Sequence, residues 1–512
     1  MKKIYFTMLA VLTLGMTSCD MDLKPYDSIP DTEALRSYTD FKNMRVGLYS
    51  PLRGLNSGTY LLTTEMMTDN FNAMVGFSNS YGDMYRWQFT PETSDFESIW
   101  GSYQILIGRC NYIIQYGNAV DMNDSEKFSE SQVIEMKQVI GEAYFMRAYS
   151  LFNLAQYFCA DYETSTAGNP DSGIAFSTVY APTSDNGTYP ARATLADTYA
   201  QIKKDIEAAK PLIPTTPTSL NKANPQAYVS QDVILAFEAR VALAMDDYAT
   251  AANKAVALIS SGSYELCADA DEILEMWQND NTPESIWQLP IPSADELASQ
   301  TGKYFLPYND GSTPDYIPSG DFLSIWSTND LRIKGYFKSA KLTTTNGTSG
   351  TVLMLNKYPD DSGIHQNVVK VESGRWQSEP KVFRIAEMYL IAAEAYAQLN
   401  DVTNGAKYLN ALQSKRFSNF TDETYANPTE LLNEVKDERR REMVMEGTRL
   451  FDLKRWHMGV TRSLTQQDDL CLFPGSTVTT KLTKAANDPK MILPIPKAEI
   501  DANPQCKQNP GY

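Results

Sequence analysis

The chain has few of the residues that most catalytic and metal centres use. Only two histidines, His365 and His457, occur among 512 residues. A histidine-rich metal site, or several separate His-dependent catalytic centres, therefore cannot be built. Six cysteines are too few for a disulfide framework. The chain also lacks a Walker-type phosphate loop, G-x-G-x-x-G, G-x-S-x-G, H-E-x-x-H and C-x-x-C. We therefore expect no catalysis, no cofactor and no metal.

Basic residues are also fewer than acidic ones. Lys and Arg total 45 against 63 Asp and Glu, for a net charge of −18. Nucleic-acid phosphates require clustered cations, and anionic lipid surfaces attract basic segments. The composition therefore argues against both partners. Aromatic residues, by contrast, are plentiful, with 30 Tyr, 20 Phe and 7 Trp. Tyr and Trp serve at binding surfaces as well as in cores.

Long hydrophobic runs are missing after the first segment of the chain. Two lysines precede an apolar stretch from Ile4 to Met16, which has the length of a signal peptide and is too short to span a membrane. Small residues before Cys19 resemble a bacterial lipobox, although Met16 stands where Leu is usual. The alternative is an ordinary cleaved signal with an incidental cysteine. We expect residues 1–18 to be removed, Cys19 to be lipidated, and residues 19–32 to form a tether. Loss of the two lysines moves the net charge from −18 to −20, so lipid rather than charge would hold the protein at a membrane.

Helical periodicity dominates the rest of the chain. Asn346-Gly347, between Thr-rich flanks, predicts a hairpin and thus a little β-structure. Three apolar helical runs carry a similar Glu-Ala signature at 141–143, 237–239 and 393–395. Small residues followed by a turn and an Ala-rich helix resemble tetratricopeptide (TPR) hairpins, and an ordinary helical bundle is the alternative. The expected helices cover about 33–55, 97–117, 132–160, 194–210, 231–245, 248–261, 381–400, 403–417 and 429–458.

A dense charged run occupies the last of these helices. Four glutamates fall at i, i+4 spacing on one face, where like charges destabilise an isolated helix. They are Glu434, Glu438, Glu442 and Glu446. Four arginines are the nearest candidates to neutralise them, namely Arg439, Arg441, Arg449 and Arg455. We interpret the run as structural and assign it no catalysis.

The same run has the pattern E-R-R-x-E-x-x-x-E-G-x-R-x-x-D-L-x-R-W over residues 438–456, which closely resembles the hallmark of the SusD/RagB family. The ending, with L-P-I-P at 493–496 and Q-N-P-G-Y at 508–512, resembles that family too. So do R-x-A-E-x-x-L-x-x-A-E-A at 384–395 and the segment 100–111, in which Leu106 stands at the usual Ile position. Together with the lipobox, these matches span essentially the whole chain.

The resemblance implies a fold and a function. We expect a mainly α fold, with a TPR-like helical superhelix and a loop-rich, irregular ligand-binding half containing a few short strands. Residues 33–512 would form one composite domain, with helix pairs at about 132–160, 194–261 and 381–458 and binding insertions at about 56–96 and 262–380. SusD-like proteins are lipoproteins on the outer face of the outer membrane. They bind oligosaccharide without catalysis and deliver it to a SusC-like TonB-dependent transporter.

Six residues are the candidates for glycan binding, because a sugar needs aromatic platforms for its CH face and polar side chains for its hydroxyls. The family places an acidic-amide pair and a later aromatic in the first insertion, and aromatics in the second. The candidates are Asp69, Asn70, Trp87, Tyr304, Trp326 and Arg375. Trp87 and Trp326 could instead be core, and Arg375 could form a structural ion pair. Four further tryptophans and three cysteines in apolar runs are expected in the core, namely Trp100, Trp277, Trp287, Trp456, Cys110, Cys159 and Cys267.

Three other functions remain open at this point. A glycoside hydrolase would need two carboxylates flanking the scissile bond, and no paired motif marks them. The same scaffold could bind peptides, as TPR surfaces do. A third possibility is a scaffold whose main role is to cap the transporter. The sequence does not identify which glycan or linkage is bound.

Overall fold

The computed structural model describes residues 35–293, 296, 299–306, 313–359, 378–472 and 482–512. The expected signal peptide and tether lie outside these residues, as does Arg375. Helices make up just under half of the described chain, and the strands are short. Within this part of the chain, none of the helices is both long enough and apolar enough to cross a bilayer.

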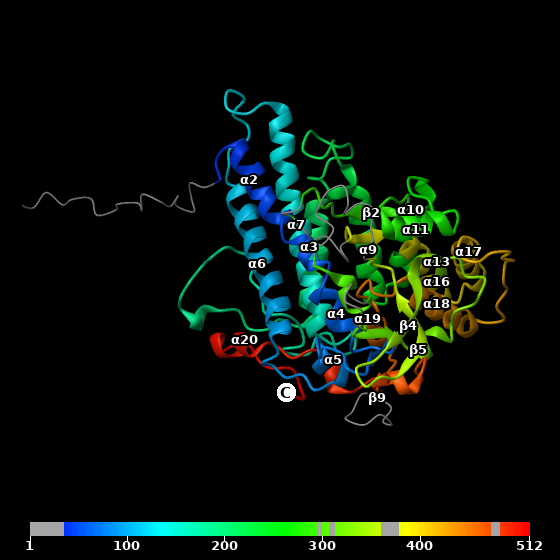
Figure 1. Ribbon diagram of the computed structural model, residues 1–512. Coiled ribbons are helices and arrows are strands. Elements are labelled where there is room, and N and C mark those ends of the chain that lie inside the picture. The colour runs from blue at the N-terminus through cyan, green and yellow to red at the C-terminus, as the bar shows by residue number, and fades with distance from the viewer. Residues whose placement is uncertain (1–34, 294–295, 297–298, 307–312, 360–377, 473–481) are drawn as a thin grey trace, which may run out of the picture.

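The N-terminal part is a group of packed helices. The long helices α6 (Ser94–Gly117) and α7 (Glu130–Phe158) lie side by side (Figure 1), and α2 (Tyr38–Tyr49) and α8 (Leu195–Ala209) pack against α7. Helix α7 begins at a capping box in which Ser129 and Gln132 each bond the other's backbone N–H. The predicted helix at 132–160 is confirmed to within two residues.

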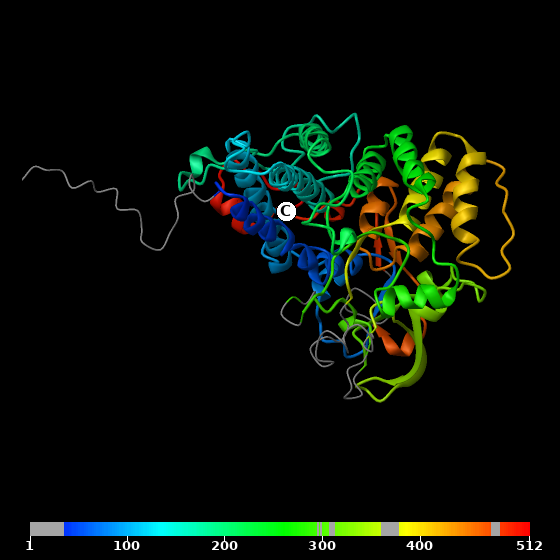
Figure 2. The same ribbon diagram turned by 90° about the horizontal axis from the view of Figure 1, so that it is seen from above.

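TPR-like helix pairs form the opposite end of the molecule (Figure 2). Small residues let the helices approach closely. A Cβ on Gly405 would lie 3.0 Å from the carbonyl oxygen of Ala393 in the facing helix, which explains the glycine. The mainly α, TPR-like fold is therefore confirmed. The helices are α9 (Gln231–Ala244), α10 (Tyr248–Ser261), α16 (Ile385–Gln398), α17 (Val402–Gln413) and α18 (Pro428–Glu442).

Three predicted helices differ from the structure. The helix predicted at 33–55 is divided into α2 and α3 (Leu52–Leu55), with Pro51 preceding α3. Residues 381–384 form strand β6 (Lys381–Arg384), which pairs with β2 (Ser285–Gln288) before α16 begins. The predicted helix at 429–458 breaks after Glu442 and resumes as α19 (Arg449–Arg455). The cause is a turn in which Met445 and Gly447 have φ of 60° and 74°, which a right-handed helix cannot accommodate.

The remaining strands lie in the loop-rich half. Strands β1 (Phe71–Met74), β3 (Tyr316–Pro318) and β8 (Cys471–Leu472) form a three-stranded sheet with β1 in the centre. The hairpin of β4 (Phe337–Thr343) and β5 (Ser349–Leu355) turns at Asn346-Gly347, as predicted. The few short strands expected from the sequence are thus present.

A buried ion network links α18 to the rest of the core and corrects the predicted pairing. Glu442 contacts three arginines from distant segments: Arg332 at 3.0 Å, Arg384 at 2.8 Å and Arg416 at 2.9 Å. Of the four arginines predicted to neutralise the glutamates, only Arg441 does so, through Glu434 and Glu438. The other three face different acids, because side chains on one helix diverge around its axis. The tryptophans and cysteines expected in the core are buried as predicted, and those cysteines are free thiols.

Candidate functional site

Two predicted hydroxyl-binding residues, Asp69 and Asn70, lie inside the protein. Arg449 forms a bidentate pair with Asp69, with Nε–Oδ1 and Nη2–Oδ2 distances of 2.9 and 2.8 Å. Burial would raise the pKa of Asp69, but the adjacent Arg440 and Arg449 lower it below its usual value. Asn70 is fully buried and accepts a hydrogen bond from Arg440 (2.8 Å). These side chains anchor α18 and α19 to the first insertion and are not directed at a ligand.

The predicted tryptophan platforms also pack inward. Trp87 is 3% exposed, and its Nε1 donates to the carbonyl oxygen of Met67 at 3.0 Å. Trp326 is half-buried and edge-on to Phe337, with ring centroids 4.8 Å apart. The Trp87 ring therefore lies inside the protein. Trp326 keeps some exposed surface, and the Arg332 guanidinium lies over its ring, 5.4 Å from the centroid.

Tyr304, like Trp326, is a predicted aromatic that is only partly buried. It ends the short 3₁₀ helix η4 (Thr301–Tyr304) and is half-buried. Its ring meets that of Tyr81 edge to face, with centroids 5.4 Å apart. Tyr81 precedes the short helix α5 (Gly82–Arg86), and its hydroxyl lies 3.0 Å from Thr59 Oγ1. The two predicted insertions, far apart in sequence, therefore bring one tyrosine each to the same place.

The loop that carries Tyr81 is held in place by several contacts. Asp315 accepts a hydrogen bond from the Ser78 backbone N–H at 2.6 Å, and the Tyr316 hydroxyl donates to the carbonyl oxygen of Ser80 at 2.5 Å. Tyr81 itself has φ of 56°, an uncommon conformation for a bulky residue. Such backbone geometry persists only where surrounding contacts enforce it, and it concentrates at binding sites.

Asp95 is a third residue of the site, together with Tyr81 and Tyr304. It lies in the first turn of α6 and is half-buried. Burial raises the pKa of its carboxyl, and its charge in turn contributes to the raised pKa of both Tyr81 and Tyr304. No hydrogen bond or ion pair joins its side chain to any residue in the described part of the chain. An acceptor that is partly desolvated and has no partner is suited to bind a donor from a ligand.

We call Tyr81, Tyr304 and Asp95 the tyrosine platform. Burial is the main reason that the pKa of Tyr81 is raised to about 12, and burial raises the pKa of Tyr304 as well. Both hydroxyls are therefore protonated near neutral pH. The platform thus offers two aromatic rings, two hydroxyl groups and a carboxylate. Rings for an apolar face and convergent polar groups for a hydroxylated rim are the elements that a sugar needs.

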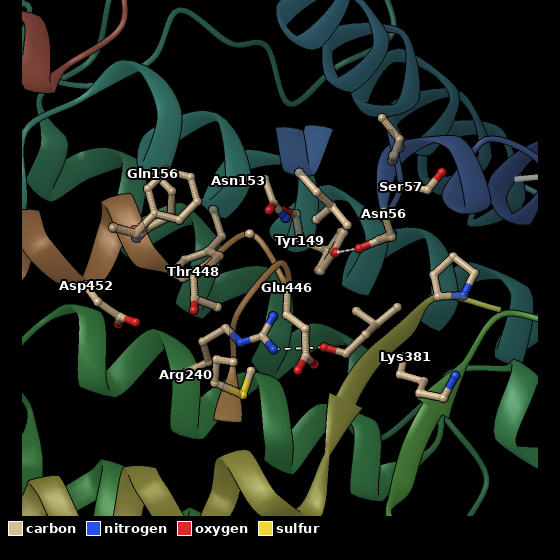
Figure 3. Close-up of a pocket in the computed structure, with 18 of the residues that line it drawn as sticks. Asn56, Ser57, Tyr149, Asn153, Gln156, Arg240, Lys381, Glu446, Thr448 and Asp452 are labelled. Carbon is tan, nitrogen blue, oxygen red and sulfur yellow. Dashed lines mark hydrogen bonds between the residues drawn. The ribbon is translucent and has the colours of Figure 1, made fainter. Parts of the chain in front are cut away.

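A separate cavity lies deeper, between the helices (Figure 3). Its wall includes Asn56 and Tyr149, whose side chains are joined by a 2.5 Å hydrogen bond, and Arg240, which donates to the carbonyl oxygen of Val382 at 2.8 Å. The cavity holds about 110 Å³. Ligand sites usually enclose roughly 300–1,000 Å³. The space suits a few water molecules and is too small for an oligosaccharide.

The sequence contained a partial signal for this site. The family resemblance predicts an aromatic some residues after the acidic-amide pair in the first insertion, and this prediction falls on Trp87. Tyr81 follows the polar stretch Ser78-Asn79-Ser80, which is typical of an exposed loop. Trp87 lies in a more apolar part of the sequence, and this difference could have favoured Tyr81 over Trp87 as the surface aromatic. Nothing in the sequence marks Asp95 as a neighbour of either ring.

Comparisons with known proteins agree with the architecture. A family profile described as "SusD family" matches residues 324–512, and another, described as "Starch-binding associating with outer membrane", matches residues 21–243. A SusD-like protein of Formosa agariphila is 22% identical over 91% of this chain and 94% of its own length. Two solved structures share the fold at 23% identity. They are a putative sugar binding protein of Bacteroides vulgatus (TM-score 0.74, covering 94% of this chain and 99% of that one) and a SusD superfamily protein of Bacteroides thetaiotaomicron (TM-score 0.75, covering 93% and 100%).

Fold and site together define a helical scaffold with a surface aromatic platform built from its loop-rich half. The two profiles cover both the N-terminal helices and the charged C-terminal run, and the structural matches extend over nearly the whole chain. The chain belongs to the SusD/RagB family.

Proposed function

We propose that this protein binds an oligosaccharide at the tyrosine platform. The proposal rests on the rings of Tyr81 and Tyr304, whose centroids lie 5.4 Å apart. The carboxylate of Asp95, which acts electrostatically on both tyrosines, has no partner among the described residues. The rings would pack against the CH face of a sugar, and Asp95 would accept a hydrogen bond from a hydroxyl. A hydrogen bond to a charged group contributes about 1.5–3 kcal/mol. Arg375 stays a prediction for this surface, since it lies outside the described residues.

The proposal includes the place of the protein in the cell. Lipid attached to Cys19 would hold it at the outer face of the outer membrane, where it would pass the oligosaccharide to a SusC-like TonB-dependent transporter. The description of the N-terminal family profile supports an outer-membrane setting, and the name of the Bacteroides vulgatus structure supports sugar as the ligand. The protein would act by binding alone, without catalysis.

Titration calorimetry against a panel of oligosaccharides tests this function. We expect Tyr304→Ala and Tyr81→Ala to weaken binding of the best ligand at least tenfold, because each removes a ring from the platform. Asp95→Asn should weaken it about tenfold by removing the charge from an acceptor. Since Asp95 is partly desolvated and unpaired, that variant should melt at the same temperature as the wild type or higher.

Tyr396→Ala is the matched control, because Tyr396 is a half-buried tyrosine that stacks on Tyr408 at the TPR-like end. It should bind glycan like the wild type. Equal loss in the control and the platform variants would contradict the proposed site. Release of reducing ends from polysaccharide would indicate a hydrolase, and retention of peptides without any glycan would indicate the peptide-binding alternative.

A further inference from the structure

A histidine and two carboxylates lie close together at a second place, formed by residues that are not part of the tyrosine platform. Asp161 and Glu163 follow the end of α7, and His457 follows the end of α19. The Nδ1 atom of His457 lies 3.4 Å from Asp161 Oδ2 and 3.9 Å from Glu163 Oε1. One ligand atom from each of the three residues lies within 4.8 Å of the other two.

The two segments that carry these residues are fixed to each other. Lys454 in α19 donates from Nζ to the carbonyl oxygens of Gln156 and Cys159, both at 2.7 Å. The backbone N–H of His457 in turn donates to the Lys454 carbonyl oxygen at 2.9 Å. The imidazole therefore faces the loop after α7 as a result of buried contacts.

The separations fit a small metal ion. A tetrahedral ion with bonds of about 2.0–2.1 Å places its ligand atoms roughly 3.3–3.4 Å apart. The 3.4 Å distance from His457 Nδ1 to Asp161 Oδ2 already has this value. Glu163 is 45% exposed and can close the remaining gap by rotation about its side-chain bonds. Ser165 donates to its other oxygen, Oε2, at 3.3 Å and leaves Oε1 on the histidine side.

The chemistry of the three groups selects the class of ion. Imidazole with carboxylates suits zinc and neighbouring transition metals, whereas calcium and magnesium prefer oxygen ligands alone. The nearby Lys454 has its Nζ bonded to two carbonyl oxygens, those of Gln156 and Cys159. Two carboxylates offset the charge of a divalent ion. The scarcity of histidine excludes a histidine-rich site, but not one with a single histidine.

We propose that Asp161, Glu163 and His457 bind one divalent transition-metal ion, with zinc as the probe. The ion would connect the end of α7 to the end of α19 and keep at least one coordination position for water. An ion that binds only the folded protein would stabilise the folded state against unfolding. This site is independent of glycan binding at the tyrosine platform.

Calorimetric titration of zinc into tag-free, EDTA-treated protein that starts at Cys19 tests the inference. We expect one bound ion per chain, a raised melting temperature, and at least tenfold weaker binding in His457→Ala and in Asp161→Asn. Removing the other histidine, His365→Ala, is the matched control and should leave affinity unchanged. Cobalt as a substitute should give visible d–d absorption that is lost in His457→Ala.

Wild-type affinity for zinc in both His457→Ala and Asp161→Asn would overturn the proposal. So would the absence of zinc binding by the wild type, or calcium binding that competes with zinc and survives the loss of His457. Because His457 is 60% exposed, its substitution is expected to leave the fold intact. A melting curve without metal verifies this.

Discussion

The burial of single aromatic side chains separates two roles in this protein, which are packing in the core and, under the proposed function, contact with a ligand. Trp87 and Tyr81 lie six residues apart in the same loop-rich segment. Trp87 is 3% exposed and bonded to a backbone carbonyl, whereas the Tyr81 ring is half-buried beside Tyr304. A tryptophan with its N–H satisfied inside the protein contributes to packing, whereas the half-buried tyrosine is the ring that we propose contacts a ligand.

Trp87→Ala tests this division at the residue scale. Loss of a fully buried tryptophan destabilises a protein by about 3–5 kcal/mol. At about 2.1 cal/mol/K of unfolding entropy per residue, a chain of this length should melt about 3–5 °C lower. Scanning calorimetry measures the shift, with Tyr396→Ala, which removes a half-buried ring, as the control. An unchanged melting temperature together with abolished glycan binding would show that Trp87 is a surface platform after all.

At the scale of an element, helix α18 carries charges that would destabilise it in isolation. Its Glu438 and Glu442 are fully buried, and arginines from three other segments bind them. Removing one partner from such a network leaves an uncompensated buried charge, which costs about 3–5 kcal/mol. The hallmark run of the sequence therefore holds the TPR-like end to the loop-rich half.

The network predicts sensitivity to acid. Burial would raise the pKa of Glu438, but Arg332 and Arg441 lower it to about 2, and three arginines hold the pKa of Glu442 well below its usual value. Because these values lie below those of the unfolded chain, the stability they provide is present above about pH 5 and lost as pH falls toward 2. Melting temperatures measured from pH 7 to pH 3 should show the fall, and Glu438→Gln should lower stability at pH 7 and flatten the profile.

Glu65→Gln is the control, because the pKa of Glu65 is shifted in the opposite direction to those of Glu438 and Glu442. Burial raises the pKa of Glu65 to about 7, so its charging is unfavourable above that pH. The variant should match or exceed wild-type stability at pH 8 and keep the acid transition. Loss of the acid transition in Glu65→Gln would contradict the assignment to the α18 network.

At the scale of the whole molecule, the net charge of −18 argues against attachment to an anionic lipid surface through basic residues. Among the residues that the structure describes, no helix is long and apolar enough to cross a membrane. Under the proposed function, attachment thus depends on lipid at Cys19.

Cys19→Ser tests that dependence in the native host. We expect the wild type to fractionate with the outer membrane and to enter the detergent phase on Triton X-114 partitioning, and the variant to enter the aqueous phase. Glycan affinity of the purified variant should be unchanged, because the platform is far along the chain from the anchor. Detergent-phase partitioning of Cys19→Ser would contradict lipid attachment at this residue.

The sequence by itself determined the class of fold, most helix boundaries and the Asn346-Gly347 hairpin, because periodicity, caps and turn residues act over a few neighbouring positions. It also indicated that Tyr304 belongs to a binding insertion. The burial of Trp87, the edge-to-face contact of Tyr81 with Tyr304, and the partners of Glu442 were decided only by the tertiary structure. Each depends on which side chains from distant segments share a space, and burial and pairing of that kind are properties of the packed chain.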